Sequence, residues 1–312
     1  MPLAVETISN LNRQIGIEME GYTETNPKNF SIPNVYNDYD GSLRNGDWAD
    51  DSDDDDDDGF CYSCDEYSCD CTWRERSSSF GVELTLCEPI RDLNDLVGIW
   101  SKMQEVGWHT GEEAGTHVHV DISDFTMEEK AKLLRFGKGI ERIIFMFVRN
   151  YRLGNSYCRS LDEAWRRVFH RSSRFSTVDW EQANNDPYND LPYWFGQNGF
   201  PRANNSKYHW MNVFGSSYPT VEFRLFNCVE NLEQIQTFAL MAYKIVEYVK
   251  NTDIGDINSA IRRMYRATTP EQAADRFCQT IGLGFTPPLI GEDAIANMYD
   301  RLNESRAVAA TV

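Results

Sequence analysis

Residues 115–122 read Gly-Thr-His-Val-His-Val-Asp-Ile. Val118 and Val120 alternate with His117 and His119. Alternation with a period of two is typical of a strand that buries one face and leaves the other open. Two imidazoles side by side on a strand suit a metal ion or a phosphate group. The stretch therefore predicts a strand with an apolar back and a chemically active front.

Three further segments alternate in the same way: residues 15–22, 81–87 and 220–226. Their apolar positions are Ile17, Met19, Val82, Leu84, Leu86, Val221 and Phe223. Their opposite positions are Glu18, Glu20, Glu83, Thr85, Cys87, Glu222 and Arg224. Four strands with apolar backs and Glu or His fronts predict one concave sheet face that is lined by carboxylates.

Each motif also has a plainer interpretation when it is taken alone. Glu18 and Glu20 lie about 6.5 to 7 Å apart if they share a strand face, and such a pair is compatible with a solvated face. A divalent cation between them would bind oxygens from both carboxylates. Glu222 and Arg224 fit a structural ion pair, or a metal ligand beside a phosphate-binding arginine. The repetition across four strands favours the ligand-binding interpretation.

Helices are expected between these strands, with starts at Asp92, Thr126 and Asn231. The apolar stripe behind Thr126 recurs at helical spacing as far as Tyr151. Stripes of this kind are expected to cover the apolar backs of the strands, which leaves the fronts open to ligands.

The chain has 312 residues, of which 41% are apolar, and this suffices for one large core. We expect a catalytic domain over residues 1–268, with an insertion at about residues 46–79, and a C-terminal helical extension over residues 269–312. In the extension, Thr269 predicts a helix start, and a turn rich in Gly and Pro at residues 282–288 precedes a short helix. No stretch approaches the roughly 18 apolar residues of a membrane span, and no signal peptide is recognisable. We therefore expect a soluble, cytoplasmic protein without a membrane partner.

The acidity of the chain is concentrated in one segment. The formal net charge is −19, and the fifteen acidic and two basic residues between Asp38 and Glu75 contribute −13, which leaves −6 elsewhere. A strongly acidic chain repels phosphate backbones, so no nucleic-acid partner is expected.

Within the insertion, the run Asp53–Asp58 is followed by four cysteines, Cys61, Cys64, Cys69 and Cys71. So polar a stretch buries too little surface to order itself, which favours a solvated loop. The thiol spacing could also close a tetrahedral zinc site, although structural zinc sites usually place their Cys pairs further apart. Disulfides rank third among these alternatives, because intracellular thiols generally stay reduced.

The ordered set of motifs resembles the amidoligase family, a branch of the carboxylate-amine ligases that share the glutamine synthetase fold. The segments that carry the resemblance are Ile15–Glu20, Asp38–Ser42, Val82–Leu84, Gly115–Asp121, Lys207–Tyr208, Asn212 and Val221–Arg224. They lie between residues 15 and 250, and their order is more specific than any single motif.

The resemblance implies an α+β fold with a glutamine-synthetase-like, curved, mostly antiparallel sheet and helices on its convex face. It implies an ATP-dependent ligase that forms an amide bond through an acyl phosphate, with Mg²⁺ or Mn²⁺. The substrates would be a carboxylate, from a peptide, a protein or an amino acid, and an amine. Because proteins of this fold often assemble, a homo-oligomer is also implied.

The resemblance also assigns roles to residues. The implied ligands of two or more metal ions are Glu18, Glu20, Glu83, His117 and Glu222. The implied catalytic set is Glu18, Glu20, Glu83, Glu222 and Arg224. The implied nucleotide-binding residues are His119, Arg224, Lys207 and Asn212, with Arg152, Arg159 and Arg202 as further candidates for phosphate or carboxylate contacts.

The chain departs from the family pattern in three ways, and two other functions stay open. The second glutamate that glutamine synthetase carries after the position of Glu83 is not evident, Thr220 stands where an arginine often lies, and the acidic insertion has no equivalent. A metal-dependent hydrolase could use His117 and His119 as ligands without ATP. An inactive scaffold or binding protein could retain the same fold.

Overall fold

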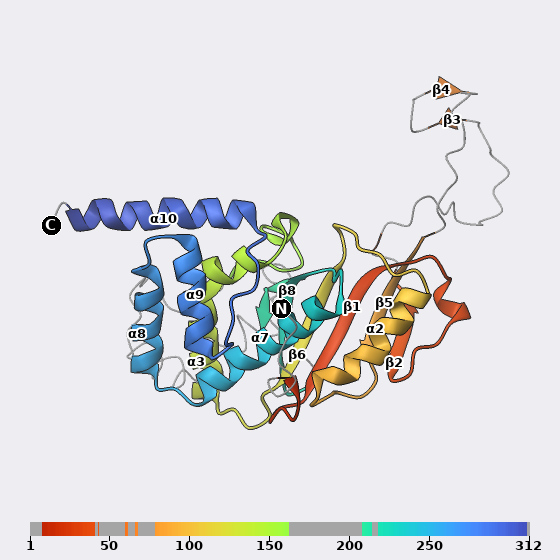
Figure 1. Ribbon diagram of the computed structural model, residues 1–312, viewed down its shortest axis with the longest axis horizontal. Coiled ribbons are helices and arrows are strands. Elements are labelled where there is room, and N and C mark those ends of the chain that lie inside the picture. Colours follow the sequence, from red (N-terminus) through yellow and green to blue (C-terminus); the bar gives the residue numbers. More distant parts are fainter. Residues whose placement is uncertain are drawn as a thin grey trace, which may run out of the picture.

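The computed structural model describes residues 8–40, 43, 60–61, 66–67, 79–161, 208–213 and 218–310. The strands of its main sheet are β1 (Ile15–Thr23), β2 (Val35–Tyr39), β5 (Phe80–Leu86), β6 (Gly115–Asp121), β7 (Met211–Asn212) and β8 (Thr220–Asn227). Their order is β2-β5-β1-β6-β8-β7, and all neighbouring pairs are antiparallel (Figure 1). The sheet is open, and the four strands predicted from alternation are confirmed.

The described part of the chain has six α-helices. They are α2 (Leu96–Glu105), α3 (Met127–Ile144), α7 (Leu232–Lys250), α8 (Ile254–Tyr265), α9 (Pro270–Ile281) and α10 (Glu292–Ala310). Helices α2 and α7 lie across one face of the sheet, α3 and α9 pack beside α7, and α8 packs against α3 and α9 (Figure 1). The architecture is therefore α+β, with a layer of helices on the apolar face. None of the described helices has the apolar length needed to span a bilayer.

Local sequence explains where three of the described α-helices begin. Thr126 and Glu129 form a reciprocal capping box at the start of α3. The side chains of Asn231 and Thr269 accept backbone N–H groups in the first turns of α7 and α9. Gly282 ends α9 with φ of 69°, a left-handed conformation that glycine adopts without steric cost. The predicted starts at Thr126, Asn231 and Thr269 are confirmed.

Three expectations about helices are wrong in detail. Asp92 caps a short 3₁₀ turn, η2 (Leu93–Asp95), and α2 begins only after it. Helix α3 ends at Ile144 rather than continuing to Tyr151, and the turns η3 (Phe145–Phe147) and η4 (Asn150–Arg152) follow it. The carbonyl of Met146 accepts the N–H groups of residues 290 and 291, a long-range pairing that replaces the next helical hydrogen bonds. Helix α10 has 19 residues, where a short helix was expected.

Two short strands, β3 (Phe60–Cys61) and β4 (Glu66–Tyr67), form a separate ladder within the insertion. Cys64, Cys69 and Cys71 lie outside the described residues, and so does the side chain of Cys61. The zinc site and the boundaries of the insertion therefore stay predictions.

The core lies between the apolar backs of the strands and the helix layer. Ile17, Val118 and Val221 are at most 1% exposed, as the alternation predicts. Phe226 of β8 stacks on Phe238 of α7 with ring centroids 4.4 Å apart. Because the period of a strand is two, burying this face directs the intervening Glu and His side chains to the other face.

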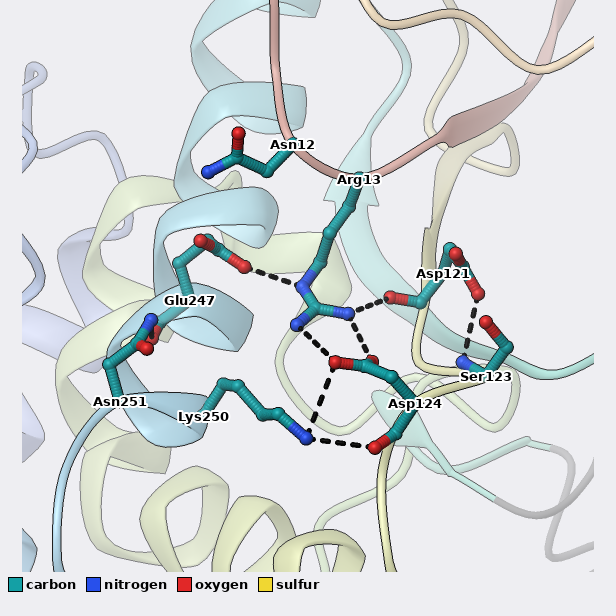
Figure 2. A pocket seen from close by; sticks show the side chains of 8 residues that line it. All are labelled: Asn12, Arg13, Asp121, Ser123, Asp124, Glu247, Lys250 and Asn251. Carbon is teal, nitrogen blue, oxygen red and sulfur yellow. Dashed lines mark hydrogen bonds and ion pairs between the residues drawn. The ribbon is translucent and has the colours of Figure 1, made fainter.

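A cluster of charged residues joins the start of β1 to α7 at one end of the sheet (Figure 2). Arg13 is 8% exposed and donates to Asp124 at 2.6 and 3.1 Å, to Glu247 at 2.5 Å and to the carbonyl of Asp121 at 3.0 Å. Lys250 pairs with Asp124 at 3.3 Å. The hydrogen bond from Arg13 lowers the pKa of Asp124 to about 2. This cluster fixes the N-terminal segment before the chain enters the sheet.

Replacing Arg13 by Met should lower the free energy of unfolding by about 2 kcal/mol. The substitution removes hydrogen bonds between charged groups, which contribute about 1.5 to 3 kcal/mol, and the half-exposed Asp124 places the loss toward the lower end. Urea denaturation at pH 7 measures it. Lys102→Met, which breaks the exposed pair with Glu105, is the control and should change stability by less than about 0.5 kcal/mol.

The same variant has a predicted dependence on pH. Because the pKa of Asp124 is lowered from 3.8, its contribution is present above pH 3.8 and is lost as the pH falls toward 2. The loss of stability over this acid range should therefore be smaller in Arg13→Met than in the wild type. Parallel acid curves for the two proteins would contradict this account of the cluster.

Candidate functional site

The register of the sheet brings the predicted residues together on its open face. Glu20 of β1 lies opposite Glu83 of β5, and Glu18 lies opposite His117 of β6. His119 lies opposite Glu222 of β8. Directly opposed residues of antiparallel strands project from the same face. Residues far apart in the sequence thus gather in three neighbouring rows on one face of the four central strands.

A first ligand group consists of Glu18, His117 and Glu222, which can each direct one ligand atom within 4.8 Å of the others. His117 Nδ1 is 3.1 Å from Glu18 Oε2 and 3.7 Å from Glu222 Oε1. His117 and Glu222 are 3% and 5% exposed, and Glu18 is partly exposed. The group is therefore recessed into the sheet, with Glu18 on its accessible side.

A second ligand group consists of Glu20, Asp40 and Glu83, again with ligand atoms within 4.8 Å of one another. Glu20 Oε2 accepts the backbone N–H of Gly115 at 2.8 Å. His117 Nε2 is 3.5 Å from Glu20 Oε1, so one imidazole lies between the two groups. The arrangement is one site with two neighbouring sets of ligand atoms.

Asp40 is the member of the site that the sequence did not reveal as a ligand. It follows β2, and its N–H donates to the carbonyl of Gly81 at 3.2 Å, which holds it beside β5. The signal was the Asp-Tyr-Asp-Gly run at residues 38–41, which carried part of the family resemblance without a ligand role. Asp40 supplies the third carboxylate of this ligand group, beside Glu20 and Glu83. The second glutamate that glutamine synthetase carries is not evident after Glu83.

The carboxylates and imidazoles strongly perturb one another. Burial alone would raise the pKa of Glu18, but the hydrogen bonds and charges of His117 and His119 outweigh it and hold that pKa well below its usual range. Burial, followed by the charges of Glu18 and Glu20, raises the pKa of Glu83. Burial would lower the pKa of His119, but its contact with Glu18 raises it. The metal-free site therefore favours an ion pair between Glu18 and protonated His119.

Two side chains, one neutral and one cationic, donate hydrogen bonds to Glu222. Asn212 of β7 donates to Glu222 Oε2 at 3.0 Å, and Arg224 Nη1 donates to Glu222 Oε1. Arg224 Nε also donates to the carbonyl of Tyr157 at 3.1 Å, and its guanidinium lies 5.6 Å from the ring centre of Tyr208. Arg224 is thus held at the edge of the site by Glu222 on one side and an aromatic ring on the other.

The donor set fits hard divalent cations. Carboxylate oxygens with an occasional imidazole are the ligands of Mg²⁺ and Mn²⁺. Among the described residues, the site contains five carboxylates but only one guanidinium, that of Arg224, and two imidazoles. Negative charge is therefore in excess. His119 Nε2 is buried without a hydrogen bond, although Glu18 Oε1 lies 3.3 Å away. An excess of carboxylates is what bound cations would offset.

The remaining predicted residues lie elsewhere or outside the described chain. Lys207 and Arg202 are not among the described residues. Arg159 is exposed, and its Nε donates to the carbonyl of Ser156. Thr220, where an arginine was expected from the family, accepts or donates a hydrogen bond at His119 Nδ1 at 3.3 Å.

Arg152 is buried against the backbone of β8, unlike an arginine that is available to bind phosphate. It is 1% exposed, and its guanidinium donates to the backbone carbonyls of Arg224 and Leu225. These contacts give it a role in the structure of β8.

Comparison with known proteins identifies one family. The sequence model of the family described as "Putative amidoligase enzyme" matches residues 11–246. This range includes both ligand groups, Asn212 and Arg224. A search of curated proteins finds no match.

The metal-free protein should lose stability as the pH rises above about 6.5. The pKa of His119 is raised above 6.5 in the folded protein, so its contribution is complete below that pH and is lost as the pH rises through the folded value. Glu83, whose pKa is also raised, acts in the same direction because the folded protein binds its proton more tightly.

Urea denaturation in EDTA from pH 5.5 to 8.5 measures this slope. His119→Gln should flatten it, while Gln104→Ala, at an exposed position on α2, should leave it unchanged. Stability that rises over this range in the wild type would contradict the proposed pairing of His119 with Glu18.

Proposed function

Because the chain belongs to the amidoligase family, we propose that it is an ATP-dependent carboxylate-amine ligase. The observation that carries the proposal is the pair of adjacent ligand groups, Glu18/His117/Glu222 and Glu20/Asp40/Glu83, on the open face of the sheet. Each group suits one divalent cation, and the two share the imidazole of His117 between them. Two ions of Mg²⁺ or Mn²⁺ are thus proposed in place of the undefined number that the sequence suggested.

The architecture supports the same proposal. An open antiparallel sheet with its helices on the apolar face leaves the opposite face available for a nucleotide and two substrates. We place this sheet in the glutamine-synthetase-like class, with the carboxylate-lined face as its concave side. The family match supports the class, because carboxylate-amine ligases of that type build their sites on such a face.

The proposed reaction has two steps. An oxygen of the carboxylate substrate attacks the γ-phosphorus of ATP, the bond between that phosphorus and the β–γ bridging oxygen breaks, and ADP leaves. The nitrogen of the amine then attacks the acyl carbon, the carbon–oxygen bond to phosphate breaks, and the amine gives up a proton. Amide formation from the free carboxylate is uphill in water, so the first step supplies the driving force.

Bound divalent cations would neutralise the negative charge that phosphoryl transfer develops on the phosphate oxygens. The chain contributes mainly position and electrostatic stabilisation. Glu222 is oriented by Asn212 and Arg224, so its oxygens are fixed before any ligand arrives. Arg224 and His119 lie at the edge of the first ligand group, where they can donate hydrogen bonds to phosphate or carboxylate oxygens.

The two substrates are proposed by class. A carboxylate of a peptide, a protein or an amino acid would be activated, and an amine, positively charged at neutral pH, would be drawn by the negative face. A cytoplasmic location and a homo-oligomeric state stay predictions from the sequence.

The proposal predicts that ATP and Mn²⁺ together stabilise the protein more than either does alone. A ligand at one hundred times its dissociation constant adds about 2.7 kcal/mol to the free energy of unfolding. Thermal unfolding measures the shift for the wild type, for Glu18→Gln with Glu222→Gln, and for Glu128→Gln as an exposed control on α3. The shift should vanish in the double variant and persist in the control. A shift with Mn²⁺ and none with ATP would favour a metal-dependent hydrolase instead.

The acyl phosphate can be tested directly with hydroxylamine in place of the amine. A library of amino acids and peptides, incubated with ATP and Mg²⁺, should yield a hydroxamate together with equal amounts of ADP and phosphate for the true carboxylate. Formation of AMP and pyrophosphate would show activation by adenylation and would overturn the proposed first step.

The second ligand group predicts that Asp40→Asn removes one of two bound ions. Replacing a carboxylate ligand by an amide removes its negative charge and weakens the site by roughly tenfold or more. Titration calorimetry with Mn²⁺ should give two sites for the wild type and one for Asp40→Asn. Asp38→Asn is the control, because Asp38 lies on β2 opposite Glu83, two residues before Asp40, but is exposed and outside the group. Loss of an ion in Asp38→Asn but not in Asp40→Asn would show that the group is wrongly composed.

A further inference from the structure

The pairing of β6 with β8 is interrupted within the site. Thr116 lies opposite Phe226 and Val118 lies opposite Phe223, so two residues of β8, Arg224 and Leu225, face His117 alone. Two residues opposite one define a β-bulge, which disrupts the ladder locally and changes the direction of the side chains beside it. The interruption coincides with His117 and Arg224, two of the residues on which the site depends.

Arg152 satisfies the backbone of this bulge. Its Nη2 donates to the carbonyl of Arg224, and its Nε donates to the carbonyl of Leu225 at 3.3 Å. On the other side, the N–H of Arg224 donates to the carbonyl of Trp210 at 2.8 Å. The backbone at Arg224 is therefore held from both sides, by a strand neighbour and by a buried side chain.

Gly115 makes the close approach of Arg152 possible. A Cβ atom at position 115 would lie 2.9 Å from both Nη atoms of Arg152 and 3.0 Å from its Cζ. The N–H of the same glycine donates to Glu20 Oε2 at 2.8 Å. The guanidinium thus contacts the backbone of β6 at Gly115 and the backbone of β8 at Arg224. These two strands carry His117 and Glu222 of the first ligand group, and the N–H of Gly115 reaches Glu20 of the second.

A buried guanidinium is costly in free energy unless its donors are satisfied. Arg152 is 1% exposed, and the acceptors named above are carbonyls rather than a carboxylate. An apolar side chain of similar length would fill the same space without desolvating a charge. The presence of arginine is explained if its fork of donors is needed to hold the carbonyls of the bulge.

From this geometry we infer that Arg152 is a positioning residue that maintains the β8 bulge and thereby sets the separation of His117, Glu222 and Arg224. This inference rests on the proposed function for its consequence in metal binding, while the structural part stands without it. Arg152 contacts neither ligand group directly, so it acts through the backbone of β8 and through Gly115.

Three variants separate the geometry from simple loss of stability. Arg152→Met removes the donors, and Arg152→Lys keeps the charge but loses the planar fork. Gly115→Ala keeps the N–H that Glu20 accepts but displaces the guanidinium. Arg149→Gln is the matched control, because Arg149 lies three residues away in an exposed pair with Glu230.

The first measurement is binding of Mn²⁺ to the full chain without nucleotide, followed by electron paramagnetic resonance at a temperature where every variant is folded. We expect Arg152→Met and Gly115→Ala to bind at least one ion roughly tenfold more weakly, as loss of residues that orient metal ligands does. Arg152→Lys should be intermediate, and Arg149→Gln should match the wild type. A variant that unfolds earlier on heating but binds Mn²⁺ normally when folded would overturn the inference.

The second measurement is amide hydrogen exchange, which needs no metal. Peptides covering residues 222–227 should exchange faster in Arg152→Met than in Arg149→Gln if the bulge depends on Arg152. If Arg152→Met exchanges faster but the wild type binds no Mn²⁺, the structural role of Arg152 is supported and the proposed function is contradicted. Unchanged exchange would overturn the inference whatever the metal result.

Discussion

Carboxylates gathered on one sheet face repel one another, and the fold must hold them together against that repulsion. Within each ligand group the ligand atoms lie within 4.8 Å of one another. Two like charges at that separation repel by about 3 to 4 kcal/mol at an effective dielectric constant of 20. A fold that holds five carboxylates this way must fix their backbones firmly, because relaxed strands would let the charges separate. The described structure does so through the long antiparallel pairing of β5, β1, β6 and β8 and through the apolar layer behind it.

The repulsion is reduced locally rather than removed. His117 lies between the two groups, His119 contacts Glu18, and Arg224 contacts Glu222. Arg224 and His119 each offset the charge of one carboxylate, and the backbone N–H of Gly115 stabilises another. What remains is a surplus of negative charge that is recessed from solvent, and a divalent cation is the partner that such a surplus favours most. The same contacts explain why the pKa of Glu18 is lowered while that of Glu83 is raised, since Glu83 has fewer cationic neighbours.

The parts that sequence predicts are those governed by local periodicity. The alternation at residues 15–22 and 115–122 identified both the strands and the faces of Glu18 and His117, because a strand that buries one face has no freedom in the other. Asp40 was not predicted as a ligand because it follows the end of β2, where the strand period no longer determines the direction of the side chain. The end of α3 was not predicted because the carbonyl of Met146 accepts the N–H groups of residues 290 and 291. Local sequence does not encode this long-range contact. The family resemblance made Arg152 a candidate for phosphate or carboxylate contacts, while only the register of β6 and β8 shows which backbone carbonyls its guanidinium binds.

The charge of the site also constrains the order in which ligands can bind under the proposed function. A carboxylate substrate that approached the bare face would meet five carboxylates, and the repulsion would exceed what Arg224 and two imidazoles offset. Cations must therefore neutralise the ligand groups first, and the phosphates of ATP, which carry charge of the same sign as the substrate, must arrive with or after them. An amine is attracted at every stage, and most strongly before the cations bind. A site of this composition thus favours metal and nucleotide before carboxylate. In that order the acyl phosphate forms only where the metal ions and ATP are already in place.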